Sequence, residues 1–168
     1  GLNVANVQLL NLKSTSVLLV DRFDRKIVDG QIFRTPMLSA LTLINGDWLC
    51  PKKREKWHYA AIADELRRRG VPTEDLHELF TRMCFNALVG NDDDHPKNHA
   101  VIFDGKGWRL SPLYDVVPCL DGEPPKYLTM RVGEHGNQIS RANLLSQHVF
   151  FGLSEAEATS IVDEVAGW

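Results

Sequence analysis

The chain has 168 residues, of which 43% are hydrophobic, and its formal net charge is −3. These values fit one globular domain with a buried core, and the slightly acidic balance gives no general electrostatic reason to bind nucleic acid. Three isolated cysteines argue against a disulfide framework or a zinc ribbon and favour a reducing cytoplasm. No apolar run approaches the ~20 residues that a membrane span requires, so no membrane contact is expected.

The N-terminal third is predicted to hold short elements. Apolar runs at residues 4–10 and 16–20 flank a polar turn, a pattern typical of an antiparallel strand pair. The second run leads into residues 21–25, where alternating charge around one aromatic side chain predicts an exposed hinge. Residues 26–55 contain several glycines and prolines that exclude a long element, although residues 39–44 could form one or two helical turns.

Two helices are predicted in the middle of the chain. Residues 57–69 place apolar side chains on one helical stripe and are followed by Gly70, a C-terminal stop signal. The second helix is expected from residue 73 to Val89, with Thr73 as its N-cap and acidic residues in its first turn. Its apolar positions predict that it is the buried central helix.

A β-hairpin is predicted after the acidic loop that follows this helix. Residues 99–103 and 108–110 are the expected strands, and residues 104–107 are the turn. Such a hairpin would bring Asp115 back toward Asp93. The proximity of these two carboxylates is therefore a prediction from the sequence.

The C-terminal part is expected to be irregular first and helical later. Glycines and prolines mark a loop-rich segment at residues 118–136. Helices are predicted at residues 143–151 and 154–165. The second of them opens with the capping box Ser154-Glu-Ala-Glu157.

Three polar residues around the predicted hairpin have the order that phosphoryl transfer requires. Asp93 stands five residues before Asn98, and Asp115 follows the hairpin. The catalytic Asp, the catalytic-loop Asn and the metal-binding Asp of protein kinases come in the same order. Asp93 could accept the proton of the attacking hydroxyl, and Asn98 and Asp115 could hold magnesium. Lys97 could stabilise charge near the transferred group, and His95 could position the loop or reach a phosphate.

The same residues allow other interpretations. Asn, Asp and Pro are common in turns, so the segment from Asn91 to Pro96 could be only a polar turn that ends a helix. A calcium loop that starts at Asn91 would need Gly at position 96 and Glu at position 102, where the chain has Pro96 and Ile102. A zinc site formed by His95 and His99 would need both on one helix face, which the intervening proline disfavours.

Four blocks in the right order carry a resemblance to a known family. They are Val20-Asp-Arg-Phe-Asp-Arg25, Met37-Leu-Ser-Ala-Leu-Thr-Leu43, Phe85-Asn-Ala-Leu-Val-Gly-Asn-Asp-Asp-Asp-His-Pro-Lys-Asn98 and Trp108-Arg-Leu-Ser-Pro-Leu-Tyr-Asp115. With these blocks the chain resembles the C-terminal catalytic region of HipA-like serine/threonine kinases, whose bacterial members include toxins of toxin–antitoxin pairs. The third block is the most specific, because it joins an Asp-x-His-x-Lys-Asn loop to the helix before it. Its Asp-x-His-x-x-Asn core is also similar to that of lipid kinases.

The resemblance implies a fold and a domain organisation. The expected fold is α+β and protein-kinase-like, with a mainly helical C-lobe that carries a catalytic β-hairpin. Residues 1–25 would be N-lobe strands and the interlobe hinge, and residues 26–168 would be the C-lobe.

The resemblance also implies roles for single residues. The activity would be ATP- and magnesium-dependent phosphate transfer to Ser or Thr of a protein, with Asp93 as the catalytic base. His95, Lys97 and Asn98 would contact the nucleotide, and Asn98 and Asp115 would hold magnesium. Asp21, Arg22 and Phe23 would form the hinge that offers backbone groups to adenine.

Partners follow from the same resemblance. The acceptor would be a protein, such as an aminoacyl-tRNA synthetase or a translation factor. A helix-turn-helix antitoxin would be a further partner, and any DNA contact would be made through it and not directly by this chain.

One departure from the family concerns the residues before the hinge. A kinase needs a phosphate-covering loop and a strand-borne Lys in that region. Only twenty residues precede Asp21 here, Gly1 is the one glycine among them, and Lys13 lies too close to the predicted turn. We therefore expect a kinase fragment, consistent with a start at Gly1, that phosphorylates little or nothing alone. Two alternatives stay open: a pseudokinase-like module that docks an antitoxin, and a small-molecule or lipid kinase on the same scaffold.

Overall fold

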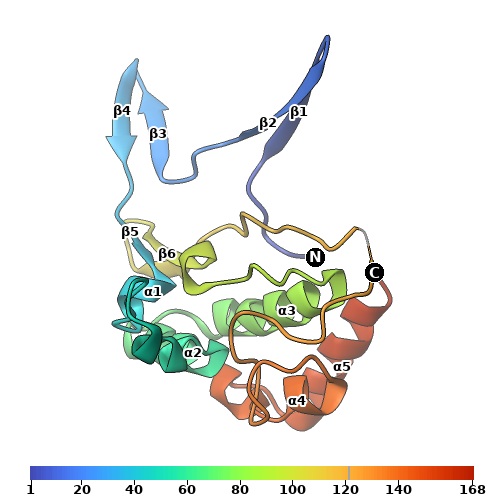
Figure 1. The fold of residues 1–168 in the computed structure, drawn as a ribbon. Helices are drawn as coiled ribbons and strands as arrows, with labels where there is room; N and C mark the ends of the chain where they lie inside the picture. Colours follow the sequence, from blue (N-terminus) through green and yellow to red (C-terminus); the bar gives the residue numbers. More distant parts are fainter. Residues whose placement is uncertain (121) are drawn as a thin grey trace.

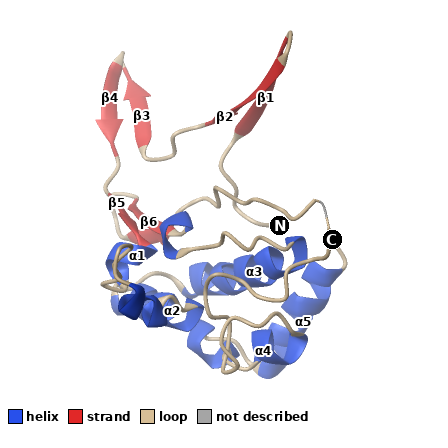
Figure 2. Ribbon diagram, viewed as in Figure 1, coloured by secondary structure: helices blue, strands red, loops and turns tan. Residues whose placement is uncertain are grey.

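The computed structural model describes residues 1–120 and 122–168 (Figure 1). Two β-hairpins project from the same side of a mainly helical body, and a small sheet lies where the second hairpin joins that body (Figure 2). The elements in chain order are β1 (Val7–Leu12), β2 (Thr15–Val20), β3 (Arg25–Val28), β4 (Gln31–Arg34), β5 (Met37–Ser39), α1 (Ala40–Leu43), the 3-10 helix η1 (Pro51–Lys56), α2 (Tyr59–Arg68), α3 (Thr73–Val89), the 3-10 helix η2 (Pro96–Asn98), β6 (Ala100–Phe103), β7 (Trp108–Leu110), α4 (Arg141–Leu145), the 3-10 helix η3 (His148–Phe151) and α5 (Glu155–Ala166). None of the helices in the described ranges combines the length and the apolar character that crossing a membrane requires.

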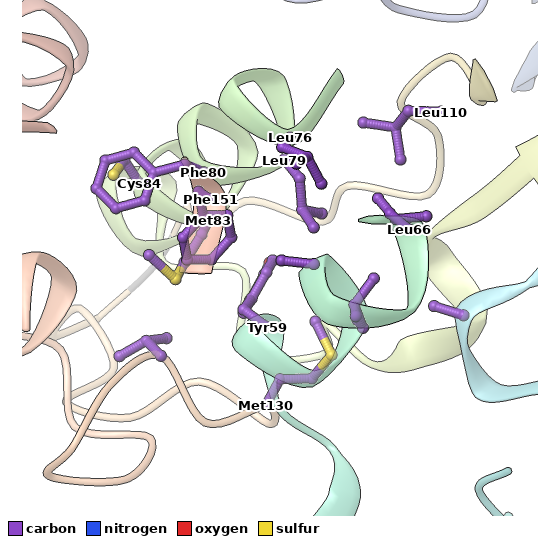
Figure 3. Close-up of a cluster of buried hydrophobic side chains, with 14 of the residues drawn as sticks. Tyr59, Leu66, Leu76, Leu79, Phe80, Met83, Cys84, Leu110, Met130 and Phe151 are labelled. Carbon is purple, nitrogen blue, oxygen red and sulfur yellow. The ribbon is translucent and has the colours of Figure 1, made fainter. Parts of the chain in front are cut away.

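The hydrophobic core lies between α2, α3, α5 and η3 (Figure 3). Phe80 of α3 and Phe151 of η3 are fully buried, and their rings meet edge to face with centroids 5.2 Å apart. Leu66 of α2 and Met83 of α3 are fully buried in the same cluster. Burial of each such side chain contributes about 1.5–3 kcal/mol, so the helical body has a core of its own.

The two central helices form where the sequence predicts them, with differences at their starts. α2 begins at Tyr59 because the backbone around Trp57 pairs with another segment: Arg131 donates to the Trp57 carbonyl (2.9 Å) and Tyr59 donates to the Arg131 carbonyl (3.1 Å). α3 spans the predicted residues, but the prediction of Thr73 as its N-cap is wrong. Pro72 occupies that position, with an extended backbone at φ −56° and ψ 150°, and Thr73 is the first helical residue.

The prediction of one helix over residues 143–151 is also wrong. α4 ends before Gln147, whose φ of −125° leaves the helical region, and η3 begins one residue later. The hydroxyl of Ser146 donates to the Asn143 carbonyl (2.7 Å), a local bond that competes with helix continuation. The capping box predicted at Ser154 is confirmed, because its side chain and backbone both bond to the glutamate three positions later.

The predicted N-terminal strand pair forms as β1 and β2, with β1 shifted toward the C-terminus. Leu12 pairs with Thr15, so the turn contains only two residues. The β3–β4 hairpin was not predicted from the sequence. It turns at Asp29 and Gly30, which both have positive φ (50° and 74°), as a tight two-residue hairpin turn requires.

The predicted β6–β7 hairpin is confirmed, and it belongs to a larger sheet. β5 pairs antiparallel with β6, with Met37 opposite Ile102, and this third strand was not predicted. Ser39 then starts α1, since its hydroxyl accepts a hydrogen bond from the Thr42 N–H (3.3 Å). The sheet therefore connects the projecting hairpins to the loop before β6.

The β1–β2 hairpin exposes apolar side chains to solvent. Leu9 and Leu18 lie directly opposite each other, and each is 59% exposed. An isolated two-stranded hairpin is marginally stable in water. The boundary predicted between residues 25 and 26 falls inside β3, and the β3–β4 hairpin projects from the same side of the helical body as β1–β2 (Figure 1). The assignment of residues 26–168 to a C-lobe stays a prediction.

Candidate active site

The candidate site is built on the loop that leaves α3. Gly90 ends the helix with φ +65°, and its N–H donates to the Asn86 carbonyl. A Cβ atom at Gly90 would lie 2.7 Å from Cδ of Pro125 and 3.1 Å from Cβ of Cys119. Glycine is therefore required here both by the left-handed backbone and by the close approach of a second segment.

We expect Gly90→Ala to lower the free energy of unfolding by about 1–3 kcal/mol, because strain at positive φ and overpacking against Pro125 add together. Denaturant unfolding measures this loss. Gly70 is a matched control, since it follows α2 with φ +68° and a Cβ atom added there would meet no described atom within 4 Å. Gly70→Ala should show only the smaller, conformational loss, and equal losses at the two sites would contradict the steric argument.

A buried hydrogen-bond network around Asp94 holds the loop that follows α3 in place. Asp94 is buried and accepts a hydrogen bond from the Tyr59 hydroxyl, and its other oxygen lies 2.7 Å from Nε2 of His99. Asn86 donates from α3 to the Tyr59 hydroxyl (3.1 Å). Burial, reinforced by the charge of Asp94, raises the pKa of Tyr59 well above its usual value, so the phenol remains a donor. The network ties α2 and α3 to the loop between Gly90 and β6.

Asn98 brings together the segments that carry the two predicted acidic residues. Its Nδ2 donates to the main-chain carbonyls of Asp93 (3.4 Å) and Asp115 (3.3 Å). Asn98 is buried, whereas Asp93 and Asp115 are exposed. Because Nδ2 makes both bonds, the amide oxygen of Asn98 is left for another partner.

The amide oxygen of Asn98 and the carboxylate oxygens of Asp115 are of the kind that binds a hard divalent cation. Carboxylate and amide oxygens are the ligands that magnesium prefers, with water and phosphate in its other positions. Within residues 1–120 and 122–168, no three His, Cys, Asp or Glu side chains converge as a metal site. A cation bound here would therefore depend on Asn98, Asp115 and oxygen atoms of a ligand.

The backbone at Asp115 has an unusual conformation. Its φ is +57°, in the left-handed region that few non-glycine residues adopt, and such strain often accompanies functional sites. The residue before it, Tyr114, donates its hydroxyl to the Lys97 carbonyl (2.6 Å) and packs against Phe23, with ring centroids 5.5 Å apart. Tyr114 thus joins three segments: the acidic loop, the segment after β7 and the link after β2.

Burial, with the nearby charge of Asp115, raises the pKa of Tyr114 to about 12. The fold favours the neutral phenol, so this contribution to stability is complete below the unfolded-state pKa of about 10 and is lost as the pH rises toward 12. We expect the ultraviolet absorbance difference between the wild type and Tyr114→Phe to titrate near pH 12. A difference that titrates near pH 10 would show that Tyr114 is not held in this environment.

α3 also anchors the segment that leads to Asp115. Arg82 is fully buried, pairs with Glu78 and donates to the Ser111 carbonyl (2.7 Å). Asp75 accepts two hydrogen bonds from the Arg109 side chain (2.8 and 2.7 Å) and one from the N–H of Leu110 (2.8 Å). One helix therefore ends at the acidic loop and also holds β7 in place.

His95 and Lys97 lie against Trp48. Nζ of Lys97 is 3.7 Å from the centroid of the Trp48 ring, and the His95 ring meets it edge on at 4.8 Å. Nδ1 of His95 is buried and has no hydrogen-bond partner among the described residues. Nucleotide binding by His95 and Lys97 stays a prediction.

Asp21, Arg22 and Phe23 form the link between β2 and β3. The N–H of Asp21 donates to the Asn6 carbonyl (2.9 Å), and Arg22 makes a bidentate pair with Asp24 (2.7 and 2.6 Å). Phe23 reaches the candidate site through its ring contact with Tyr114. The adenine-binding role of this link stays a prediction, and the N–H of Asp21 could serve it only after leaving Asn6.

Sequence reasoning missed the residues that support the loop. Nothing in the sequence distinguished Asp94 from the two exposed aspartates before it. Tyr59 was predicted only as a member of the apolar stripe of a helix. Trp48 gave no signal, because its segment has no periodic pattern. The one hint in the sequence was that Asp94 stands five residues before His99. This spacing indicates a supporting hydrogen bond only once both residues are known to be buried.

The chain is similar in sequence to known proteins. A family model described as the HipA-like C-terminal domain matches residues 1–168. Y4mE of Sinorhizobium fredii is 30% identical over 139 residues, which are 80% of this chain and 33% of that protein. The serine/threonine-protein kinase toxin HipA of Shewanella oneidensis is 27% identical over 133 residues, 70% of this chain and 30% of that protein. The chain thus spans about a third of the length of these curated relatives.

A solved structure shares the fold. It is the complex of HipA, HipB and operator DNA from the toxin–antitoxin system of Shewanella oneidensis MR-1, and it matches with a TM-score of 0.77 at 21% identity. The match covers 99% of this chain and 43% of the matched chain. The predicted fold class, α+β and protein-kinase-like, is confirmed.

Proposed function

The chain belongs to the HipA-like C-terminal domain family, and from this premise we propose that the longer protein transfers phosphate from ATP to Ser or Thr of a protein, with magnesium. The observation that carries the proposal is the Asn98 amide, which bonds to the backbone of both Asp93 and Asp115. Phosphoryl transfer depends mainly on positioning and charge neutralisation; this arrangement would serve the positioning, and a bound magnesium ion would supply the neutralisation.

The proposed roles follow from exposure and hydrogen bonding. Asp93 is exposed beside the buried Asn98 and would accept the proton of the acceptor hydroxyl. The amide oxygen of Asn98 and the carboxylate of Asp115 would hold magnesium, which neutralises phosphate charge when it is bound. Lys97 and His95 would contact the phosphates from the same loop. The link between β2 and β3, which contains Phe23, would contact the adenine.

We also propose that this activity needs the rest of the longer protein. The chain spans about a third of its curated relatives, and the β1–β2 hairpin exposes apolar residues along its whole length. Unpaired strand edges and exposed apolar faces are surfaces to which further strands add. Those strands would complete a small lobe and supply the phosphate-covering loop and the nucleotide-binding Lys. The 168-residue chain alone would bind nucleotide weakly.

The test uses the full-length protein with ATP labelled on its γ-phosphate, with magnesium or with a chelator. Magnesium-dependent label on Ser or Thr of a protein supports the proposal. Label on lipids or small molecules alone would favour the kinase alternative with a different acceptor. Nucleotide binding without any transfer would favour the pseudokinase-like module.

A partner is proposed from the matched structure. The Shewanella oneidensis HipA was solved with HipB and operator DNA. By analogy, a helix-turn-helix antitoxin would bind the longer protein, and DNA contact would pass through that partner. A cytoplasmic location and an acceptor such as an aminoacyl-tRNA synthetase or a translation factor belong to the same proposal.

A further inference from the structure

A basic surface lies beside the candidate active site, on η1 and the residues just before it. η1 contains three lysines and one arginine against a single glutamate, in a chain whose net charge is −3. Lys52, Arg54 and Lys56 are exposed. Trp48 and Leu49 precede them and are 37% and 87% exposed. We call these five residues the η1 surface.

The positive charge of the η1 surface is not neutralised within the described chain. No carboxylate of a described residue lies within 4 Å of the charged nitrogens of Lys52, Arg54 or Lys56, and Lys53 pairs with Asp47 only at 3.8 Å. The other basic run, residues 67–69, differs in this respect. Each of its arginines pairs with an acidic residue one turn earlier on the same helix.

Aromatic contacts connect the η1 surface to the loop that carries Asp93. Trp48 stacks on the buried Trp57, with centroids 5.4 Å apart and planes at 24°, and the Arg54 guanidinium lies 5.1 Å from the Trp57 ring centroid. Trp48 also contacts Lys97 and His95 of the acidic loop. Unpaired cations and apolar side chains therefore adjoin the loop that carries the predicted catalytic base.

We propose that the η1 surface docks an acidic segment of the protein acceptor, an inference that rests on the proposed function. Free cations complement acidic side chains, and exposed Trp and Leu side chains provide the apolar contact that protein interfaces bury. A nucleic acid fits less well. Its backbone carries one charge every few ångströms and would also meet the exposed Asp92 and Asp93.

The test compares two double variants of the full-length protein. Lys52→Glu with Lys56→Glu reverses two charges of the η1 surface. Lys13→Glu with Lys106→Glu is the matched control, because both lysines are exposed, lie on the β1–β2 and β6–β7 turns and, like Lys52 and Lys56, have no carboxylate of a described residue within 4 Å. The probes are two serine peptides that differ only in flanking residues, Glu in one and Gln in the other.

We expect the wild type and the control to phosphorylate the Glu peptide with a lower KM than the Gln peptide. The η1 variant should raise KM for the Glu peptide about tenfold and leave KM for ATP unchanged. The preference for Glu should weaken as salt is added, because exposed charges are screened. Equal KM values in both variants, or a change only in KM for ATP, would overturn the inference.

A binding measurement separates this inference from the proposed function. Fluorescence anisotropy of a labelled Glu peptide, measured with Asp93→Asn protein, does not require phosphate transfer. Binding that the η1 variant loses would support the docking surface even if no transfer occurs. Failure of the Glu peptide to bind the η1 surface, or binding there of a DNA duplex in its place, would contradict an acidic polypeptide as the occupant.

Discussion

Replacing Asp93 by Asn in the full-length protein should reduce phosphate transfer about 10²–10⁴-fold, the usual contribution of a general base. The side chain is exposed and nearly isosteric with its replacement, so the fold should not change. Its backbone carbonyl, which receives the Asn98 amide, is retained in the variant. Initial rates of labelled phosphate transfer measure the effect.

Asp92 provides a matched control for this prediction. It is exposed and carries the same charge one position earlier. Its hydrogen bonds use only the backbone: its N–H donates to the Gly90 carbonyl (3.0 Å), and its carbonyl accepts from the Thr129 hydroxyl. Asp92→Asn should therefore keep most of the transfer rate. If both variants lost the same amount, the effect would come from the local negative charge and not from proton acceptance by Asp93. If neither lost activity, the assignment of Asp93 as the base would be wrong.

Replacing Asp94 by Ala should lower the free energy of unfolding by about 3–5 kcal/mol, because removing one partner leaves the rest of a buried polar network unsatisfied. His99 would lose its hydrogen-bond partner, and the Tyr59 hydroxyl would lose its acceptor. A loss of this size is a large fraction of the stability of an ordinary domain. Denaturant unfolding, followed by tryptophan fluorescence, measures it.

An exposed ion pair offers the comparison. Arg141 and Asp163 lie 2.5 Å apart, but both are at the surface. Asp163→Ala should cost little, because exposed pairs contribute little to stability in water. A comparably small loss for Asp94→Ala would mean that the buried network does not hold the loop. A large loss with full activity in the surviving folded protein would mean that the network stabilises the fold without positioning Asp93.

Part of the candidate site could be predicted from the sequence because its signals are local. Asp93 and Asn98 stand on one short loop, so their spacing is visible in the chain. Asp115 could be placed near them because a β-hairpin returns the chain to its start, and the alternation of residues 99–110 indicates such a hairpin. The Asp29-Gly30 turn was a local signal of the same kind, and the β3–β4 hairpin could have been predicted from it.

The supporting contacts could not be predicted, because their partners are distant in sequence. Tyr59 lies 35 residues before Asp94, and Arg82 lies 29 residues before Ser111. The sequence shows an acid, a phenol and an arginine, but not whether water or another side chain satisfies them. Trp48 is likewise an isolated aromatic until the fold places it on Trp57, His95 and Lys97.

The amino-acid sequence by itself determined the two central helices, the C-terminal helix, the β6–β7 hairpin and the order of the three polar residues, because periodicity and short-range turn chemistry act within a few residues. The tertiary structure alone decided which aspartates are exposed, which one is buried against Tyr59 and His99, and which cations remain unpaired. The physical reason is that burial and electrostatic pairing depend on the segments that folding brings together, and these segments are far apart along the chain.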